Sequence, residues 1–98
     1  MTLRKDFPYL YETHMHTCEA SNCAHSTGAQ MAQAAKEAGY TGVIITDHNW
    51  HGNNCIDSGL AWDKWVTAFC KGFENAKARG NEIGLDVFFG YEYFPIRY

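Results

Sequence analysis

The chain has 98 residues, enough for one small domain, so we treat residues 1–98 as a single unit. Hydrophobic residues make up 46% of the sequence, a share that predicts a folded rather than a disordered chain. The formal charge is −3 and only eight residues are basic, so no basic stripe is available for a polyphosphate backbone. A nucleic-acid partner is therefore not indicated.

The beginning of the chain carries Arg4 and Lys5 but no apolar stretch behind them, so we expect no signal peptide. No apolar run is long enough to cross a bilayer, and no membrane partner is expected. A cytoplasmic location is the default expectation.

The four cysteines show no CxxC spacing. In a cytoplasmic chain we expect reduced thiols, and Cys70 falls within a helical pattern that predicts a buried thiol. A four-cysteine zinc site is the alternative, which the irregular spacing disfavours. The cysteines are Cys18, Cys23, Cys55 and Cys70.

The first half of the chain predicts a strand, a loop and a helix. Alternating Tyr and Thr favour a strand over Tyr9–Thr13, followed by a polar loop over Thr17–Ser26. Ser26 or Thr27 can then cap a helix that runs to about Ala38 and ends at a left-handed Gly39. We expect this helix to bury Met31, Ala35 and Ala38.

The second half predicts a strand, a loop, a helix and a strand. The apolar run Gly42–Thr46 is typical of a parallel strand that is covered on both faces. An exposed loop, His48–Gly59, leads to one helix over Ala61–Ala78 that Gly80 closes, and a last strand spans Leu85–Phe89. The apolar face of the second helix comprises Trp62, Val66, Phe69, Phe73 and Ala76.

Alternating strands and helices indicate an α/β fold with parallel strands and right-handed crossovers. Functional sites in such folds collect at the carboxyl ends of the strands. All three predicted strands end in residue types that bind metals. These residues are His14 and His16 after the first strand, Asp47 and His48 after the second, and Glu92 after the third.

Imidazole and carboxylate ligands together suit Zn, Mn, Fe or Co. His14 and His16 share one side of their strand, and His48 with Glu92 could bind the same ion or bridge to a second. Such ions lower the pKa of water and stabilise an oxyanion, which implies hydrolysis, most plausibly of a phosphate ester. Asp47 is expected to orient a ligand histidine or to transfer a proton, with a loop cap as the alternative.

Other polar and aromatic residues have simpler interpretations. Glu92 could instead pair with an arginine such as Arg97. His25 and His51 are expected to be solvated loop residues. Helix core is favoured over a substrate platform for Trp62, Trp65 and Phe69.

Three stretches resemble motifs of the PHP family, which is named for polymerase and histidinol phosphatase. Glu12–Thr17, with His-x-His-Thr after a strand, is similar to the first motif. Residues 35–49, a helix end and a glycine turn followed by Thr-Asp-His, resemble the second, and Phe89–Glu92 resembles the third, Gly-x-Glu. Order and spacing match, and the likeness covers essentially the whole chain.

The resemblance implies a distorted TIM-like (β/α)7 barrel with up to three divalent metal ions (Zn, Mn or Fe) at its mouth. It also implies phosphoesterase activity, on histidinol phosphate in some members, and hence a small phosphorylated substrate. On this likeness the metal ligands are His14, His16, His48 and Glu92, with Asp47 beside them as the catalytic residue.

The chain departs from the family in two respects. Related sequences often carry an acidic residue or a histidine shortly after the first motif, where this chain offers Glu19 or Cys23. A full eightfold barrel needs roughly 250 residues. The chain is therefore expected to be an amino-terminal portion, with three strands, two helices and an incomplete site.

Two other classes of function stay open. The chain could be a non-catalytic metal-binding or interaction module of the same family. It could also be an amidohydrolase-type enzyme, which likewise uses His-x-His on a barrel strand, although the Thr-Asp-His and Gly-x-Glu segments disfavour this.

Overall fold

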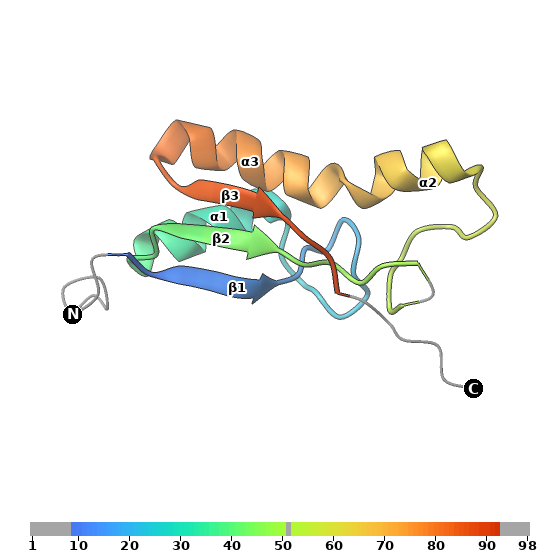
Figure 1. Ribbon diagram of the computed structural model, residues 1–98, viewed down its shortest axis with the longest axis horizontal. Helices are drawn as coiled ribbons and strands as arrows, with labels where there is room; N and C mark the ends of the chain where they lie inside the picture. The colour runs from blue at the N-terminus through green and yellow to red at the C-terminus, as the bar shows by residue number, and fades with distance from the viewer. Residues whose placement is uncertain (1–8, 51, 93–98) are drawn as a thin grey trace.

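Three parallel strands form one sheet in the computed structural model, which describes residues 9–50 and 52–92 (Figure 1). The strands are β1 (Tyr11–Met15), β2 (Gly42–Ile45) and β3 (Asp86–Phe89), and they lie in the order β1-β2-β3. Both pairings are parallel. The predicted α/β class and parallel sheet are therefore confirmed.

β1 lies two residues later in the chain than predicted. Its pairing with β2 ends where Met15 lies opposite Ile45, after an irregularity in register that follows Glu12. The backbone N–H of Thr46 donates to the carbonyl of Met15 at 2.7 Å, which extends the pairing to this residue. Met15 enters the core, so the strand continues until this apolar side chain is buried. His14 consequently lies within the strand.

The first helix, α1 (Gly28–Glu37), begins and ends close to the predicted residues. Thr27 caps it, and the reciprocal contacts of a capping box with Gln30 are present. Gly39 follows the helix with φ of 96°, as expected for a left-handed C-terminal residue. The predicted buried face was partly wrong, because Ala38 is exposed and Ala32 is buried in its place.

The predicted second helix is in fact two helices, α2 (Trp62–Phe69) and α3 (Lys71–Ile83), which meet at Cys70. α2 carries Trp65 and Phe69 into one apolar cluster, whereas α3 packs into another. Because of the break, each of the two adjacent helices packs its apolar side chains into a different cluster. Gly80 does not close a helix as predicted. It lies within α3, and Gly84, with φ of 75°, ends that helix.

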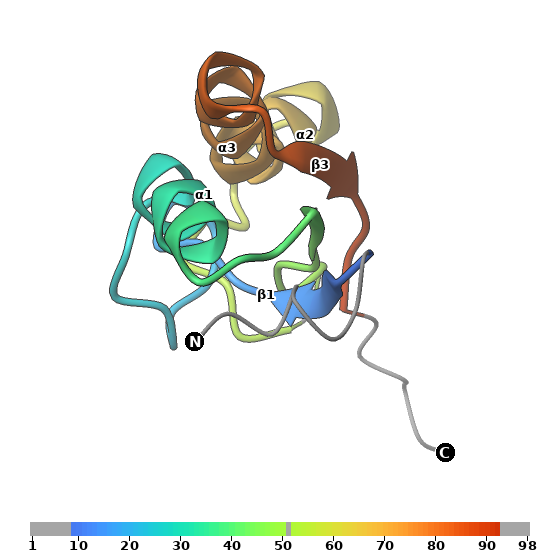
Figure 2. The ribbon, with the colours of Figure 1, turned by 90° about the vertical axis from the view of Figure 1, so that its left-hand side faces the viewer.

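The two longest helices, α1 and α3, lie on the same side of the sheet (Figure 2). Small residues permit their close approach, since a Cβ atom added to Gly28 would overlap the backbone of Gly72. The main core lies between these helices and the sheet. It contains Met15, Ala32, Ala35, Val43, Ile45, Ala76, Leu85 and Val87.

The opposite side of the sheet carries exposed rings. Tyr11 and Phe88 lie there with their ring centroids 6.2 Å apart, and Phe88 is 50% exposed. None of the helices formed by the described residues is long and apolar enough to cross a membrane.

Candidate metal centre

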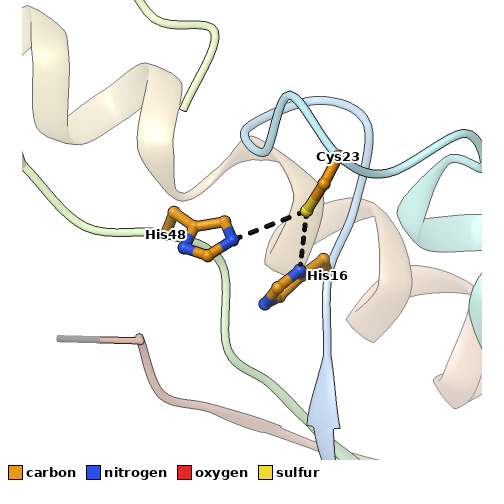
Figure 3. Close-up of side chains that lie close together, drawn as sticks. All are labelled: His16, Cys23 and His48. Atoms are coloured by element: carbon orange, nitrogen blue, oxygen red, sulfur yellow. Dashed lines mark hydrogen bonds between the residues drawn. The ribbon is translucent and has the colours of Figure 1, made fainter. Parts of the chain in front are cut away.

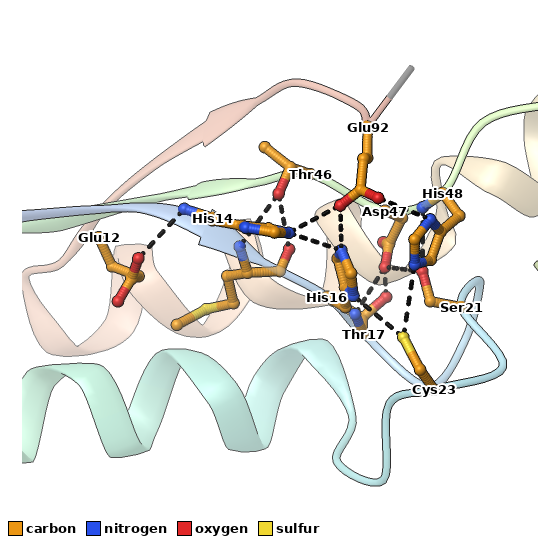
Figure 4. A network of polar contacts seen from close by, with 11 residues as sticks. Glu12, His14, His16, Thr17, Ser21, Cys23, Thr46, Asp47, His48 and Glu92 are labelled. Carbon is orange, nitrogen blue, oxygen red and sulfur yellow. Dashed lines mark hydrogen bonds and ion pairs between the residues drawn. The ribbon is translucent and has the colours of Figure 1, made fainter. Parts of the chain in front are cut away.

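The carboxyl ends of the three strands meet at one edge of the sheet. Beyond β2 and β3 the backbones stay paired, because the N–H of Glu92 donates to the carbonyl of Asp47 at 2.8 Å. The N–H of Asn49 donates to the carbonyl of Glu92 at 3.1 Å. These bonds fix Glu92 beside His48, while β1 delivers His14 and His16 from the other side (Figure 4).

The Glu92 carboxylate lies among three imidazole rings. Its Oε1 is 2.7 Å from Nε2 of His14 and 3.1 Å from Nε2 of His16. Its Oε2 is 3.2 Å from Nδ1 of His48. The two Nε2 atoms of His14 and His16 are themselves 3.1 Å apart. The structure thus brings together all four residues that the sequence predicted as metal ligands.

The surrounding histidines alter the acidity of Glu92. Loss of solvent acts to raise the pKa of this carboxyl, but the hydrogen bonds to His16 and His14 and the charge of His48 outweigh it. The net effect is a pKa below the usual value for glutamate. The histidines thus favour the ionised carboxylate, the form that accepts hydrogen bonds or coordinates a cation.

Cys23 joins the cluster from the loop between β1 and α1 (Figure 3). Its Sγ lies 3.1 Å from Nδ1 of His16 and 3.5 Å from Nε2 of His48. Glu19, the other candidate for the missing ligand, points elsewhere. Its carboxylate accepts hydrogen bonds from the backbone N–H of Gly28 and from the side chain of Asn75. Of the two, only Cys23 lies at the cluster.

Asp47 lies beneath the cluster and is only 1% exposed. It accepts hydrogen bonds from the N–H of Thr17 at 2.6 Å, the hydroxyl of Thr17 at 2.7 Å and the hydroxyl of Ser21 at 2.8 Å. Ser21 in turn accepts from the backbone N–H of His48 at 3.0 Å. Asp47 therefore holds in place the residue after His16 and, through Ser21, the backbone of His48, and its role in a reaction stays a prediction.

Sequence reasoning missed Ser21, since a single serine in a polar loop carries no distinctive signal. The loop histidine His25 is exposed, as predicted. His51 and Arg97 lie outside the described residues, so the predictions about them stay predictions. Trp65 is buried as predicted, but Trp62 is 62% exposed and does not belong to the helix core.

The spacing of the ligand atoms can be compared with a metal shell. In tetrahedral zinc sites with Zn–N bonds of about 2.0–2.1 Å, ligand nitrogens lie about 3.3 Å apart. The ligand atoms of His14, His16 and Glu92 lie 2.7–3.1 Å apart. Each pair would have to separate by a few tenths of an ångström to reach the spacing of ligands around a zinc ion. A thiolate sulfur and a nitrogen on one zinc ion lie about 3.6 Å apart. The 3.5 Å contact of Cys23 with His48 is close to this value, whereas its 3.1 Å contact with His16 is shorter.

Two groups of residues bring their ligand atoms within 4.8 Å of one another and could hold an ion, His14 with His16 and Glu92, and His16 with Cys23 and His48. All four cysteines are free, but Cys70, which was predicted to be buried, is only partly buried. Comparisons with models of protein families, with curated proteins and with solved structures gave no match.

Proposed function

We propose that the chain binds divalent transition metal ions (Zn, Mn or Fe) at this edge of the sheet and contributes to the hydrolysis of a small phosphate ester. The ligands are His14, His16, His48 and Glu92, with Cys23 as an additional one. The observation that carries the proposal is the position of Glu92, whose two carboxylate oxygens face histidines from two different strand ends.

The tautomers of the histidines set how ions are held. A neutral imidazole has one bare nitrogen and one N–H, so each ring coordinates on one side only. If Nδ1 of His48 donates to Glu92 Oε2, its Nε2 is bare toward Cys23. If Nδ1 of His16 donates to the Cys23 sulfur, its Nε2 is bare toward His14. This assignment gives one ligand set of His14, His16 and Glu92 Oε1, and it leaves the Cys23 sulfur with Nε2 of His48 as a pair, because Nδ1 of His16 then carries a proton.

Bound ions of this kind supply Lewis acidity toward water and a phosphoryl oxygen. The residues of the chain contribute orientation. Asp47 fixes Thr17 and Ser21, which locks the backbone on both sides of the cluster. A shallow cavity of about 340 Å³ beside the cluster offers room for a phosphate group. It is lined by Thr13, His14, Thr46, Tyr91 and Glu92.

We further propose that the sheet forms part of a distorted (β/α)7 barrel of the PHP type. The consecutive order of β1, β2 and β3 and the placement of α1 and α3 on one side support this. A doubly wound fold would reverse strand order and place helices on both sides.

The proposal is tested by metal analysis and by phosphatase assay of the purified chain with Mn or Zn. We expect metal near stoichiometry in the unmodified protein and a large loss in His14→Ala. The matched control is His25→Ala, which removes an exposed histidine from a loop outside the cluster and should bind metal normally. Equal metal content in both variants would overturn the assignment of the ligands.

A metal-binding module without turnover is the second candidate. It is favoured by the 63% exposure of the His14 side chain, since hydrolytic sites usually exclude bulk water. Stoichiometric metal without hydrolysis of any phosphate ester would select this candidate over the first.

A further inference from the structure

His16 belongs to both groups of candidate ligands. Its Nε2 lies 3.1 Å from Nε2 of His14 and 3.1 Å from Oε1 of Glu92. Its Nδ1, on the other edge of the ring, lies 3.1 Å from Sγ of Cys23 (Figure 4). We call His14, His16 and Glu92 the carboxylate set, and His16, Cys23 and His48 the thiolate set. The two sets thus lie on opposite edges of one imidazole ring.

Glu92 orients both histidines of the thiolate set. Its Oε1 faces Nε2 of His16, and its Oε2 faces Nδ1 of His48 at 3.2 Å. When these two ring nitrogens donate protons to Glu92, the opposite nitrogens are bare toward Cys23, at 3.1 and 3.5 Å from Sγ (Figure 3). Metal-binding histidines commonly donate their other N–H to a carboxylate in this way. The arrangement therefore fits a three-ligand site of one sulfur and two nitrogens.

The loop that carries Cys23 is fixed to the loop that follows His48. Asn22, directly before Cys23, donates its backbone N–H to the carbonyl of Asn53 at 2.9 Å. Its side chain donates to Oδ1 of Asn53 at 3.1 Å and to the carbonyl of Asn54 at 2.8 Å. The protein itself therefore positions the sulfur near His48, which lowers the entropic cost of binding an ion there.

The two sets require opposite tautomers of His16. The carboxylate set needs a bare Nε2, whereas the thiolate set needs a bare Nδ1 and a protonated Nε2. A neutral imidazole has only one bare nitrogen, so His16 can coordinate in one set at a time. An ion in one set therefore removes His16 from the other.

The two sets favour different ions. A thiolate is a soft ligand that selects zinc and similar ions, whereas carboxylate oxygens and water suit manganese. The side chains of His16 and His48 are 18% and 16% exposed, while that of His14 is 63% exposed and leaves room for water ligands. We therefore expect zinc in the thiolate set and manganese in the carboxylate set.

The carboxylate set faces the cavity proposed for the phosphate group. His14 and Glu92 line this cavity of about 340 Å³, and neither Cys23 nor His48 does. An ion in the carboxylate set is therefore next to the phosphate, whereas the thiolate set lies on the other edge of the His16 ring.

We propose that the thiolate set is an inhibitory site for thiophilic divalent ions such as zinc, and that filling it removes His16 from the ion that supports hydrolysis. Manganese then supports the reaction and zinc suppresses it. The inhibition rests on the proposed function, but the binding of a thiophilic ion through Cys23 does not.

The binding test uses cobalt(II), which accepts the same nitrogen and sulfur ligands as zinc and, unlike zinc, absorbs light. Titration of the reduced, metal-free protein should produce a thiolate-to-cobalt charge-transfer band in the near ultraviolet. Cys23→Ser should lose the band. The matched control Cys55→Ser, at an exposed thiol that points at backbone carbonyls, should keep it. A band that survives Cys23→Ser, or no band in the unmodified protein, would overturn the inference.

The exclusion is tested by adding cobalt(II) to the manganese-loaded protein. Free manganese gives a sharp electron paramagnetic resonance signal that broadens on binding, so this signal should appear as the charge-transfer band grows. Losing even an outer-shell partner of a ligand typically costs about 10–100-fold in metal affinity, so Cys23→Ser should need at least about tenfold more cobalt for the same release. A band that grows while manganese stays bound would overturn the inference. So would zinc that raises the rate of manganese-supported hydrolysis.

Failure of the proposed function gives a different result. Metal analysis of His14→Ala, made with manganese, tests the carboxylate set, whereas the cobalt band should persist in this variant because His14 is not in the thiolate set. A protein that shows the band but neither binds manganese nor hydrolyses an ester would overturn the proposed function, and with it the inhibition. It would leave intact the binding of a thiophilic ion through Cys23.

Discussion

The carboxylate of Asp47 accepts two hydrogen bonds from Thr17, one from the backbone N–H at 2.6 Å and one from the side-chain hydroxyl at 2.7 Å. Both residues are almost fully buried, so neither group can exchange its partner for water. Because Thr17 directly follows His16, this contact connects the geometry of the candidate metal centre to the protein interior.

Asp47→Ala should lower the free energy of unfolding by about 3 kcal/mol, because it leaves the N–H and hydroxyl of Thr17 and the hydroxyl of Ser21 without their acceptor. Urea denaturation followed by circular dichroism measures the effect. The control is Asp57→Ala, at an exposed carboxylate in the loop after β2, which should change stability by under about 0.5 kcal/mol. Similar losses in the two variants would contradict a special role for Asp47.

Gly72→Ala should destabilise the fold even though alanine is the better helix former. A Cβ atom at Gly72 would lie 2.7 Å from Cβ of Thr17 and would overlap its hydroxyl. We expect a loss of about 1–3 kcal/mol, as for other overpacked cores. Thermal and urea unfolding measure it.

The control for Gly72→Ala is Gly59→Ala, where an added Cβ would meet only the end of the flexible Asp57 side chain, at 3.2 Å. A Gly72→Ala variant as stable as the unmodified protein would mean that α3 can move away from Thr17 without cost.

Zinc should protect Cys23 from alkylation but leave Cys55 reactive. Both thiols are exposed, yet only Cys23 lies beside imidazole nitrogens, whereas Cys55 points at the backbone carbonyls of Cys18 and Glu19. Iodoacetamide labelling with and without zinc, read by peptide mass spectrometry, gives both rates in one sample. Protection of both cysteines, or of neither, would argue against a site at Cys23.

Cys18 should be alkylated slowly near neutral pH. Burial, and then the negative charge of Glu19, raise the pKa of the Cys18 thiol above its ordinary value. A raised pKa means less thiolate at a given pH, so the labelling profile should lie at higher pH in the folded protein than in urea. Rates of iodoacetamide labelling across pH 7–10, roughly the range of cysteine ionisation, test this. Coinciding folded and unfolded profiles would count against it.

The order of the elements follows from the sequence because hydrophobic periodicity and turn residues report on local structure. The meeting of His14, His48 and Glu92 also follows, since parallel strands place their carboxyl ends at one edge. No sequence pattern marks the break at Cys70, because the apolar period of the second helix continues through it. The bounds of β1 likewise depend on hydrogen bonds with Thr41 just before its start and with Thr46 at its end, which only the tertiary fold provides.

The position of Cys23 shows a different kind of limit. It is set by the path of the loop, which the N–H of Cys18 closes by donating to the carbonyl of Ser26 at 2.9 Å. The β-bridge between Ser21 and Asn54 then pairs this loop with the loop after β2. Contacts between two loops leave no periodic trace in a sequence, so the choice between Glu19 and Cys23 required coordinates.

The strand order has a consequence for the folding pathway. Residues 14 and 92 touch across a separation of 78 positions, and every intervening strand must pair before they meet. Closing so long a loop is entropically expensive and comes late in folding. The cluster therefore cannot nucleate the chain. We therefore expect the apolar contacts of α1 and α3 with the sheet to form first and the cluster to be completed after them.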